Sequence, residues 1–181
     1  MAYLKFPLFC RRVGPDHVCG TLLHAQYELV DSNIKRLKSM LSEKLRDDLD
    51  HGYISEPPTS SSRLKMMSVT VHPSYKTEDG NFPAPAPVIV NIPVVLGRTS
   101  HGYSECRLPL FNESFYFYDD ARMAGLVEHF TRDHMRNMPP EEVHRFIEPG
   151  DFWLETVPVK DKRRTLRGRP EFDPRDPPSL A

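Results

Sequence analysis

The stretch from Asn112 to Met135, NESFYFYDDARMAGLVEHFTRDHM, does most to predict the fold of this chain. Its first part is rich in aromatic residues and predicts a strand over residues 114–118. Asp119 or Asp120 can cap a helix that follows at once. Apolar side chains at spacings of three and four then predict a buried stripe, which consists of Met123, Leu126, Val127, Phe130, His134 and Met138. A strand and a helix joined this tightly must pack on each other, and other segments must cover what they leave open.

A second amphipathic helix is predicted nearer the N-terminus. Asp31 or Ser32 can cap it, and Gly52 ends it. Its apolar positions recur every three or four residues and are Val30, Ile34, Leu37, Leu41, Leu45 and Leu49. The opposite face is charged, as a solvent-exposed helix face should be.

The remaining segments up to residue 159 are predicted to be strands and connections. The strands are expected over residues 3–12, 17–23, 63–72, 88–96, 103–111 and 151–159, with an extended Pro-rich segment over 73–87 and a short helix over 141–147. Pro7 and Pro93 each remove a ladder donor, so we expect Pro7 at an edge or with its missing donor facing outward, and Pro93 at a bulge or an edge. Consecutive strands with two long helices indicate one α+β domain over residues 1–159. It would have a mainly antiparallel sheet of about five to seven strands, with the two main helices packed on one face.

Composition limits the classes of function. The 181 residues suit one domain and a tail, and the 18 prolines, about twice the usual ~5%, gather in connections and near the end. A formal net charge of −1 excludes general affinity for nucleic acid through bulk charge. From Lys160 the chain has seven Lys or Arg against four Asp or Glu, and hydrophobic patterning stops. Residues 160–181 are therefore expected to form a charged, Pro-rich linker, solvated rather than bound to nucleic acid.

Cysteine usage and hydropathy bear on the compartment. Three cysteines are too few for a disulfide scaffold. The N-terminus lacks the apolar core of a signal peptide, and no stretch approaches the ~18 apolar residues of a membrane span. We therefore expect a cytoplasmic protein without a membrane partner.

Two candidate ligand sites can be weighed from the sequence. Residues 97–104 have the G-x-x-x-x-G spacing of a phosphate-binding loop, but Tyr103 stands where the lysine is required, so a hairpin turn is favoured. Cys10, Cys19, His17 and His24 could hold zinc if the two cysteines faced each other across the first hairpin. Zinc sites usually contain ligand pairs two to four residues apart, and the two cysteines lack this spacing. Buried cysteines are the favoured reading, so we expect neither a metal nor a cofactor.

Catalytic residues are not predicted. His129 and Asp133 lie four apart on the second long helix and could form a general-base pair, but ion pairing on a solvated face is the simpler account. No G-x-S-x-G motif occurs, and no cysteine has a local nucleophile signature.

Taken in order, the segments resemble the N-terminal domain that precedes the ATPase modules of bacterial Clp/Hsp100-like AAA+ ATPases. Four features carry the resemblance: an opening strand with Phe6-Pro7-Leu8, the leucine-spaced helix, the aromatic strand that enters an acidic-started helix with His129-Phe130, and a closing strand with Trp153-Leu154-Glu155-Thr156. The resemblance covers most of residues 3–159 and is one of pattern, without an invariant motif. The chain has neither a Walker A nor a Walker B motif, and its Pro83–Pro93 region is richer in proline than that pattern. No residue here is assigned to ATP hydrolysis.

The resemblance implies a non-catalytic domain that recruits protein substrates or adaptors for an ATPase ring in the same chain. ATP is then expected only in a downstream module, and the natural chain is expected to continue past Ala181. Two alternatives stay open: a free-standing adaptor that ends near Ala181, and a small metal-dependent or histidine-based enzyme. A binding edge for an extended peptide is expected along the Pro83–Leu96 segment, with Val88, Val90, Asn91 and Ile92 as tentative contact residues.

Overall fold

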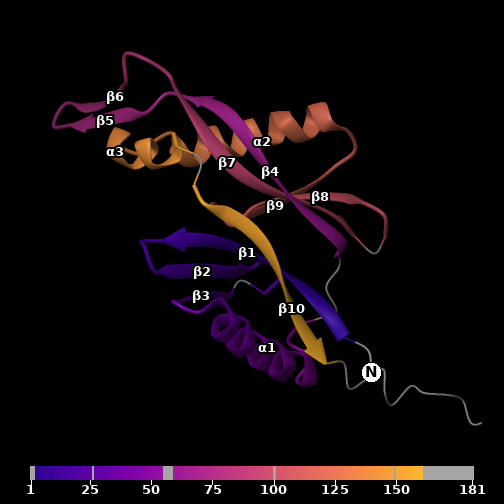
Figure 1. Cartoon of the computed structure of the whole chain (residues 1–181). Coiled ribbons are helices and arrows are strands. Elements are labelled where there is room, and N and C mark those ends of the chain that lie inside the picture. Colours follow the sequence, from indigo (N-terminus) through magenta and orange to yellow (C-terminus); the bar gives the residue numbers. More distant parts are fainter. Residues whose placement is uncertain (1–2, 26, 55–58, 100, 149, 161–181) are drawn as a thin grey trace, which may run out of the picture.

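The computed structural model of the chain describes residues 3–25, 27–54, 59–99, 101–148 and 150–160. These residues form an α+β fold with antiparallel sheets, which confirms the predicted fold class. Where the sequence predicts one sheet, the strands divide over two four-stranded sheets and a two-stranded hairpin. Each four-stranded sheet carries one long helix, so that helix, sheet, sheet and helix follow one another across the molecule (Figure 1).

Lobe A is the sheet that contains both ends of the described chain, together with its helix. Its last strand in sequence pairs antiparallel with its first, from Tyr3 opposite Lys160 to Arg11 opposite Phe152. In sheet order the elements of lobe A are β10 (Phe152–Lys160), β1 (Tyr3–Val13), β2 (His17–Leu22) and β3 (Tyr27–Asp31), followed by α1 (Ile34–Asp50).

Lobe B is built from one continuous part of the chain. In sheet order its elements are β4 (Thr59–Val71), β7 (Val88–Thr99), β8 (Ser104–Leu108) and β9 (Glu113–Phe117), followed by α2 (Asp120–Met135), α3 (Pro140–Val143) and the 3-10 turn η1 (His144–Phe146). The Pro-rich connection between β4 and β7 was predicted to be extended. It contains instead the hairpin of β5 (Ser74–Thr77) and β6 (Gly80–Pro83). Gly80 permits this turn because its φ is 131°, a value that other residues rarely adopt.

Helix α1 forms where the leucine spacing predicts it. Its N-cap is Asn33, one or two residues later than predicted, and the Asn33 side chain accepts hydrogen bonds from the backbone N–H groups of Lys35 and Arg36. Val30 therefore precedes the helix; it lies in β3 and is 54% exposed. The sequence prediction missed β3 because this short strand runs directly into the capping turn. The leucines that pack α1 onto the sheet are all buried, namely Leu37, Leu41, Leu45 and Leu49.

Helix α2 begins as predicted, because the Asp119 side chain accepts a hydrogen bond from the N–H of Arg122 at 2.7 Å. Its fully buried stripe consists of every fourth residue: Met123, Val127, Thr131 and Met135. The prediction that His134 is buried is wrong. His134 is exposed, and its ring stacks on Phe111 with a centroid distance of 4.8 Å. Thr131 was missed because its hydroxyl reads as polar in the sequence.

A small apolar cluster joins the lobes where the inner faces of the two sheets meet. Its buried members are Phe9, Leu23 and Val95, and the partly buried residues packed on them are Leu64, Leu110, Phe152 and Leu154. Arg107 of lobe B also donates a hydrogen bond from Nη1 to the carbonyl oxygen of Leu23 in lobe A. The sheets therefore touch over a limited area, and hollows flank the contact.

Pro7 and Pro93 occupy matching places in the two sheets. Each lies in an inner strand just before the pairing with the next strand begins, at Leu8 in β1 and at Val95 in β7. The Thr99 N–H donates to the Tyr103 carbonyl across the β7–β8 hairpin, so the backbones of odd-numbered β7 residues face the β8 side. Before Val95 that side has no paired strand, and the nitrogen of Pro93 faces it. The missing N–H of Pro93 therefore breaks no ladder hydrogen bond. The Pro7 carbonyl accepts from the Leu23 N–H at 3.5 Å, so Pro7 faces the chain after β2, where the Leu23 carbonyl accepts from Arg107 instead. The expected edge position is wrong for both prolines. Pro93 needs no bulge, because its register with β4 is regular.

The remaining boundaries differ little from the prediction. The short helix expected over 141–147 is divided into α3 and η1. Lys160, assigned to the tail from the sequence, is the last residue of β10, and residues 161–181 lie outside the described residues. Among the described residues, no helix is both long and apolar enough to span a membrane.

Thr131 offers a test of the lobe B core. Its side-chain hydroxyl is buried without a hydrogen-bond partner, and such a group costs free energy when it is removed from water. We expect Thr131→Val, which keeps the branched shape, to raise the free energy of unfolding by about 1 kcal/mol in urea denaturation. The matched change Thr70→Val on the exposed face of β4 should alter it by less than ~0.5 kcal/mol. A Thr131→Val protein no more stable than the parent would contradict this account of the core.

Candidate functional site

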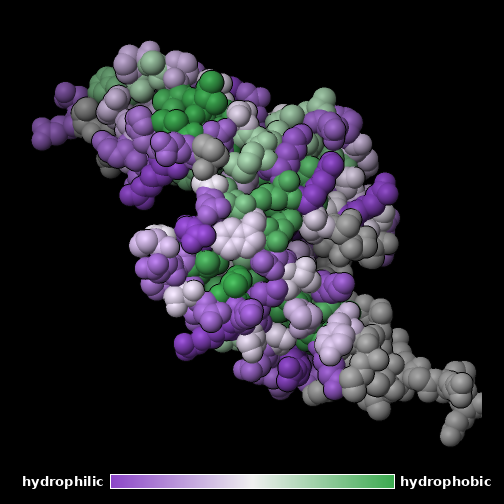
Figure 2. All heavy atoms as spheres, in the orientation of Figure 1, coloured by the Kyte–Doolittle hydropathy of each residue, from purple (hydrophilic) through white to green (hydrophobic). Residues whose placement is uncertain are grey.

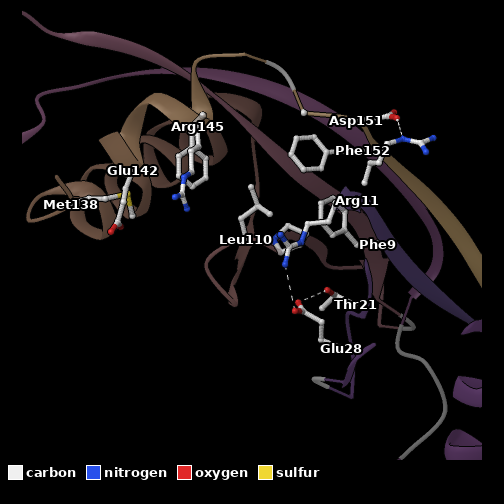
Figure 3. Close-up of a pocket in the computed structure, with 14 residues that line it drawn as sticks. Phe9, Arg11, Thr21, Glu28, Leu110, Met138, Glu142, Arg145, Asp151 and Phe152 are labelled. Carbon is white, nitrogen blue, oxygen red and sulfur yellow. Dashed lines mark hydrogen bonds and ion pairs between the residues drawn. The ribbon is translucent and has the colours of Figure 1, made fainter. Parts of the chain in front are cut away.

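A groove of about 430 Å³ lies between lobe A and the end of lobe B that carries α3 (Figure 3). Figure 2 shows the molecule hollowed between these two parts. Lobe A contributes Phe9, Arg11, Arg12, Thr21, Glu28 and the start of β10 with Gly150, Asp151 and Phe152; lobe B contributes Pro109, Leu110, Met138, Glu142, Arg145 and Phe146. The volume is within the range of ~300–1,000 Å³ that is usual for ligand-binding pockets.

The floor of the groove is apolar. The rings of Phe9 and Phe152, from the paired strands β1 and β10, stack with centroids 5.6 Å apart. Leu110, in the turn after β8, lies between the two walls (Figure 3). Gly150 allows the chain to pass close to Phe152, because a Cβ at position 150 would lie 2.5 Å from that ring. Phe9 is only 1% exposed, so an apolar group entering the groove would meet the partly exposed Phe152 and Leu110, with Phe9 packed beneath them.

The lobe A wall carries charges that already pair with one another. Arg12 donates from Nε to Asp151 at 2.8 Å, and Arg11 lies 3.5 Å from Glu28, which also accepts a hydrogen bond from the Thr21 hydroxyl at 3.1 Å. Both ion pairs are substantially exposed, so each contributes at most ~1 kcal/mol to stability. The charged groups of such exposed ion pairs can bind a ligand instead of each other with little loss of free energy.

The opposite wall carries charges without internal partners. Glu142 and Arg145 project from the α3–η1 segment beside Met138 (Figure 3), and both are exposed. Within the described part of the chain, neither side chain forms an ion pair. Above its apolar floor, the groove therefore presents to a ligand one carboxylate and one guanidinium that form no ion pair among the described residues.

The predicted binding edge lies on β7, outside this groove. Pairing with β8 begins only at Val95, so β7 before Val95 is paired with β4 alone among the described strands. Of the four tentative contact residues, only Asn91 directs its backbone to the unpaired side. Val90 and Ile92 are fully buried, and the backbones of Val88, Val90 and Ile92 face β4. The Asn91 side chain donates to the Ile147 carbonyl at 2.6 Å, so the segment after η1 borders this edge. Partner binding there stays a prediction.

The sequence stretches weighed for ligands are placed as follows. Within residues 97–104, β7 ends at Thr99 and β8 begins at Ser104; the favoured hairpin turn lies between them, where the Gly102 N–H donates to the Thr99 carbonyl and Gly102 has a φ of 85°. Cys10 lies opposite Gly20 and Cys19 lies opposite Arg11, so strand alternation places the two thiols on opposite faces of the sheet. They cannot share one zinc ion. No group of three or more possible metal ligands is found among the described residues.

The cysteines are buried, and the His129 and Asp133 side chains, considered above as a general-base pair, each contact another residue. Burial raises the pKa of the Cys10 thiol to about 12 and that of Cys106 to about 12, so both are protonated at neutral pH. On α2, Asp133 pairs with Arg136 at 3.0 Å, and the His129 ring contacts Phe130 edge-on. These contacts agree with the simpler structural reading of the helix.

A second hollow, of about 120 Å³, also lies at the boundary of the lobes, and Thr21 and Pro109 line both it and the groove. His24, Arg107 and Ser114 line it among others. The Arg107 guanidinium donates to Glu105 at 2.7 Å as well as to Leu23. Burial and, secondarily, the charge of Arg107 lower the pKa of His24 to about 4.

The low pKa of His24 predicts a dependence of stability on pH. His24 is neutral in the folded protein but binds a proton below about pH 6.5 when unfolded, so its stabilising contribution is lost as pH falls from about 6.5 to 4. We expect His24→Gln to remove this part of the pH dependence in thermal unfolding followed by circular dichroism. If His24→Gln and the parent showed the same difference in Tm between pH 7 and pH 4.5, groups other than His24 would cause the pH dependence. In the NMR titration of the parent, the His24 ring should titrate near pH 4.

The sequence did not single out the groove residues, because they come from six separate segments without a local motif. The adjacent arginines Arg11-Arg12 in an otherwise apolar strand are the one local feature that could have drawn attention to it. Comparisons of the chain with protein-family models, curated proteins and solved structures find no match.

Proposed function

We propose that this chain is a recruiting module that binds an extended segment of a protein substrate or adaptor in the groove between the lobes. The observation that carries the proposal is an open groove over Phe152, which stacks on the buried Phe9, with Glu142 and Arg145 on the far wall forming no ion pair among the described residues. Aromatic floors with a few polar groups at the rim are typical of sites that bind apolar side chains and orient the backbone that carries them.

The charge distribution favours a peptide over nucleic acid. Arginines and carboxylates alternate around the groove, so a uniformly negative ligand would meet repulsion from Glu28, Glu142 and Asp151. A peptide carries both N–H and C=O groups and can place an apolar side chain on the floor. We therefore take a mixed-charge or neutral peptide with a central apolar residue as the partner class.

The resemblance to N-terminal domains of Clp-like AAA+ ATPases supports the wider role. In that role the module captures protein cargo and a downstream ATPase, joined through the residues after β10, acts on it. A tether of this kind raises the local concentration of the captured cargo at the ATPase. ATP would then bind in that downstream module and not in the lobes described here.

Peptide binding tests the groove. The probe is a set of fluorescein-labelled ten-residue peptides with Gly and Ser flanks and a central Leu, Phe or Asp, followed by fluorescence anisotropy. We expect binding of the Leu and Phe peptides, and a loss of at least about tenfold for Leu110→Asp, since burial of one apolar side chain is worth ~1.5–3 kcal/mol. Ile89→Ser, a change of a 60% exposed residue outside the groove, should leave the affinity unchanged.

The β7 edge supplies the competing outcome. Ile89→Pro removes a backbone N–H on the unpaired side of β7 and therefore blocks the addition of a strand. Loss of binding with Ile89→Pro but not with Leu110→Asp would overturn the groove and favour the edge. Absence of binding by all peptides and by a cell extract would overturn the recruiting role.

The tether has its own test. In the native cell, an immunoblot against this domain should show a band far above 20.9 kDa if an ATPase module follows in the same chain. A band at 20.9 kDa would contradict the attachment to an ATPase and leave a free-standing binder.

A further inference from the structure

The two lobes correspond residue by residue at a constant spacing of 86 positions. Pro7 corresponds to Pro93, and the N-cap Asn33 corresponds to the N-cap Asp119, without an insertion or deletion between these pairs. β3 and β9 correspond over their whole length. The buried positions of the helices keep the same spacing, so that Leu37, Leu41, Leu45 and Leu49 of α1 correspond to Met123, Val127, Thr131 and Met135 of α2.

The flanking strands complete the correspondence. β4 pairs with β7 as β10 pairs with β1, and Val69 opposite Val90 corresponds to Val159 opposite Leu4 (Figure 1). Both lobes thus consist of one flanking strand, a three-stranded meander and a helix. Lobe A takes its flanking strand from the far end of the chain, and lobe B adds the β5–β6 hairpin, α3 and η1. This arrangement indicates one unit present twice, with the chain closing on itself through β10.

The groove has a counterpart in this scheme. Its floor contains the cross-strand pair Phe9 and Thr21 of lobe A, which corresponds to the cross-strand pair Val95 and Arg107 of lobe B. Leu110 at the groove corresponds to His24, which lines the smaller hollow together with Arg107. The groove measures about 430 Å³ and the smaller hollow about 120 Å³. Equivalent places in the two lobes therefore differ both in volume and in the side chains that line them, and Thr21 and Pro109 line both hollows.

We infer that lobe B contains a closed twin of the groove, and that Arg107 closes it. In lobe A the short Thr21 side chain turns to Glu28 and leaves the groove open. In lobe B the Arg107 guanidinium reaches across to the Leu23 carbonyl of lobe A and is anchored by Glu105, which is only 4% exposed and corresponds to Cys19. A partly buried ion pair thus stands where lobe A has the smaller residues Thr21 and Cys19. The consequence is that the protein offers one groove to its partner instead of two.

The chemistry of the pair points to selection for closure more than for stability. Burying a charge pair costs desolvation that its attraction often fails to recover, and the Arg107 Nε is buried without a partner. Small apolar residues at positions 105 and 107 would avoid the desolvation free energy of the charged pair. The long side chain instead spans the lobe boundary, which a small residue could not do.

Thiol accessibility tests closure without any ligand. Leu110→Cys and His24→Cys place single reporter thiols at equivalent positions of the two hollows, and the native cysteines are all buried. The readout is the rate of modification by N-ethylmaleimide. We expect Thr21→Arg to slow the reporter at position 110 by about tenfold, and Arg107→Thr to speed the reporter at position 24 by about tenfold, because access limits thiol reactivity. A nearby guanidinium also lowers a thiol pKa and so favours reaction, which opposes both expected changes; steric closure alone explains them.

Controls separate closure from damage to the fold. Arg98→Thr removes an exposed arginine from the same strand pair and should leave the rate at position 24 unchanged. If circular dichroism shows that Arg107→Thr unfolds the protein, the double variant Glu105→Ser with Arg107→Thr replaces it, because it also removes the carboxylate that would be left buried without an ion-pair partner. Thr21→Arg in lobe A tests closure independently. Unchanged rates at position 24 in a folded Arg107→Thr or double variant, or at position 110 in a folded Thr21→Arg variant, would overturn the inference.

The identity of the occupant rests on the proposed function, and a separate arm tests it. With the central-Leu peptide, isothermal titration should give one site per chain in the parent and none after Thr21→Arg; it should still give one after Glu105→Ser with Arg107→Thr, because the opened twin has Val95 and His24 in place of Phe9 and Leu110. If the thiol rates change as expected but no peptide binds any variant, the closed twin stands and the recruiting function fails.

Discussion

The antiparallel pairing of β1 with β10 is the constraint on which the structure depends. It joins the first described residues to the last, from Tyr3 opposite Lys160 onward, and without it lobe A is a three-stranded sheet with an open edge. It also places Phe9 beside Phe152 and so creates the floor of the groove. Because lobe B is continuous in sequence, its contacts close shorter loops than the pairing of the chain ends, which favours earlier formation of lobe B. Lobe A and the groove then form together, when the ends meet.

The modest contact between the sheets explains why hollows exist at the lobe boundary. The two outer faces of the molecule are covered by α1 and α2 over long apolar stripes, whereas the inner faces share only a small cluster around Phe9, Leu23 and Val95. Away from that cluster, the inner faces carry polar and charged residues. Polar inner faces cannot collapse onto each other without unpaired groups, so space remains beside the contact. The side chains at these places then decide which space stays open.

Local features of the fold could be read from the sequence, and distant pairings could not. The helices were predictable because Leu37 to Leu49 and Met123 to Val127 repeat with the helical period, and the Asp119 cap follows from local chemistry. The division into two sheets was not predictable, since it depends on β10 returning to β1 across the whole chain. Thr131 shows a further limit, because a buried stripe can include a hydroxyl whose burial no local pattern reports. The groove residues come from β1, β2, β3, the turn after β8, the α3 region and the start of β10, and they come together only in three dimensions.

The correspondence between the lobes was hidden for a similar reason. Few positions are identical across it; Pro7 and Pro93 share a constraint on hydrogen bonding, while the helix stripe keeps its burial and changes its side chains. Burial and backbone demands persisted while identity was lost. A search for repeated letters would miss this repeat, and a comparison of burial and register finds it.

The direction of β10 has a mechanical consequence. The strand starts at the groove with Phe152 and ends at Lys160 beside Tyr3, at the opposite end of lobe A. Eight residue steps of extended chain span about 26 Å at ~3.3 Å per residue. Whatever is joined after Lys160 therefore meets the body about 26 Å from the groove. β10 acts as a fixed spacer that holds anything seated on Phe152 away from the point of attachment.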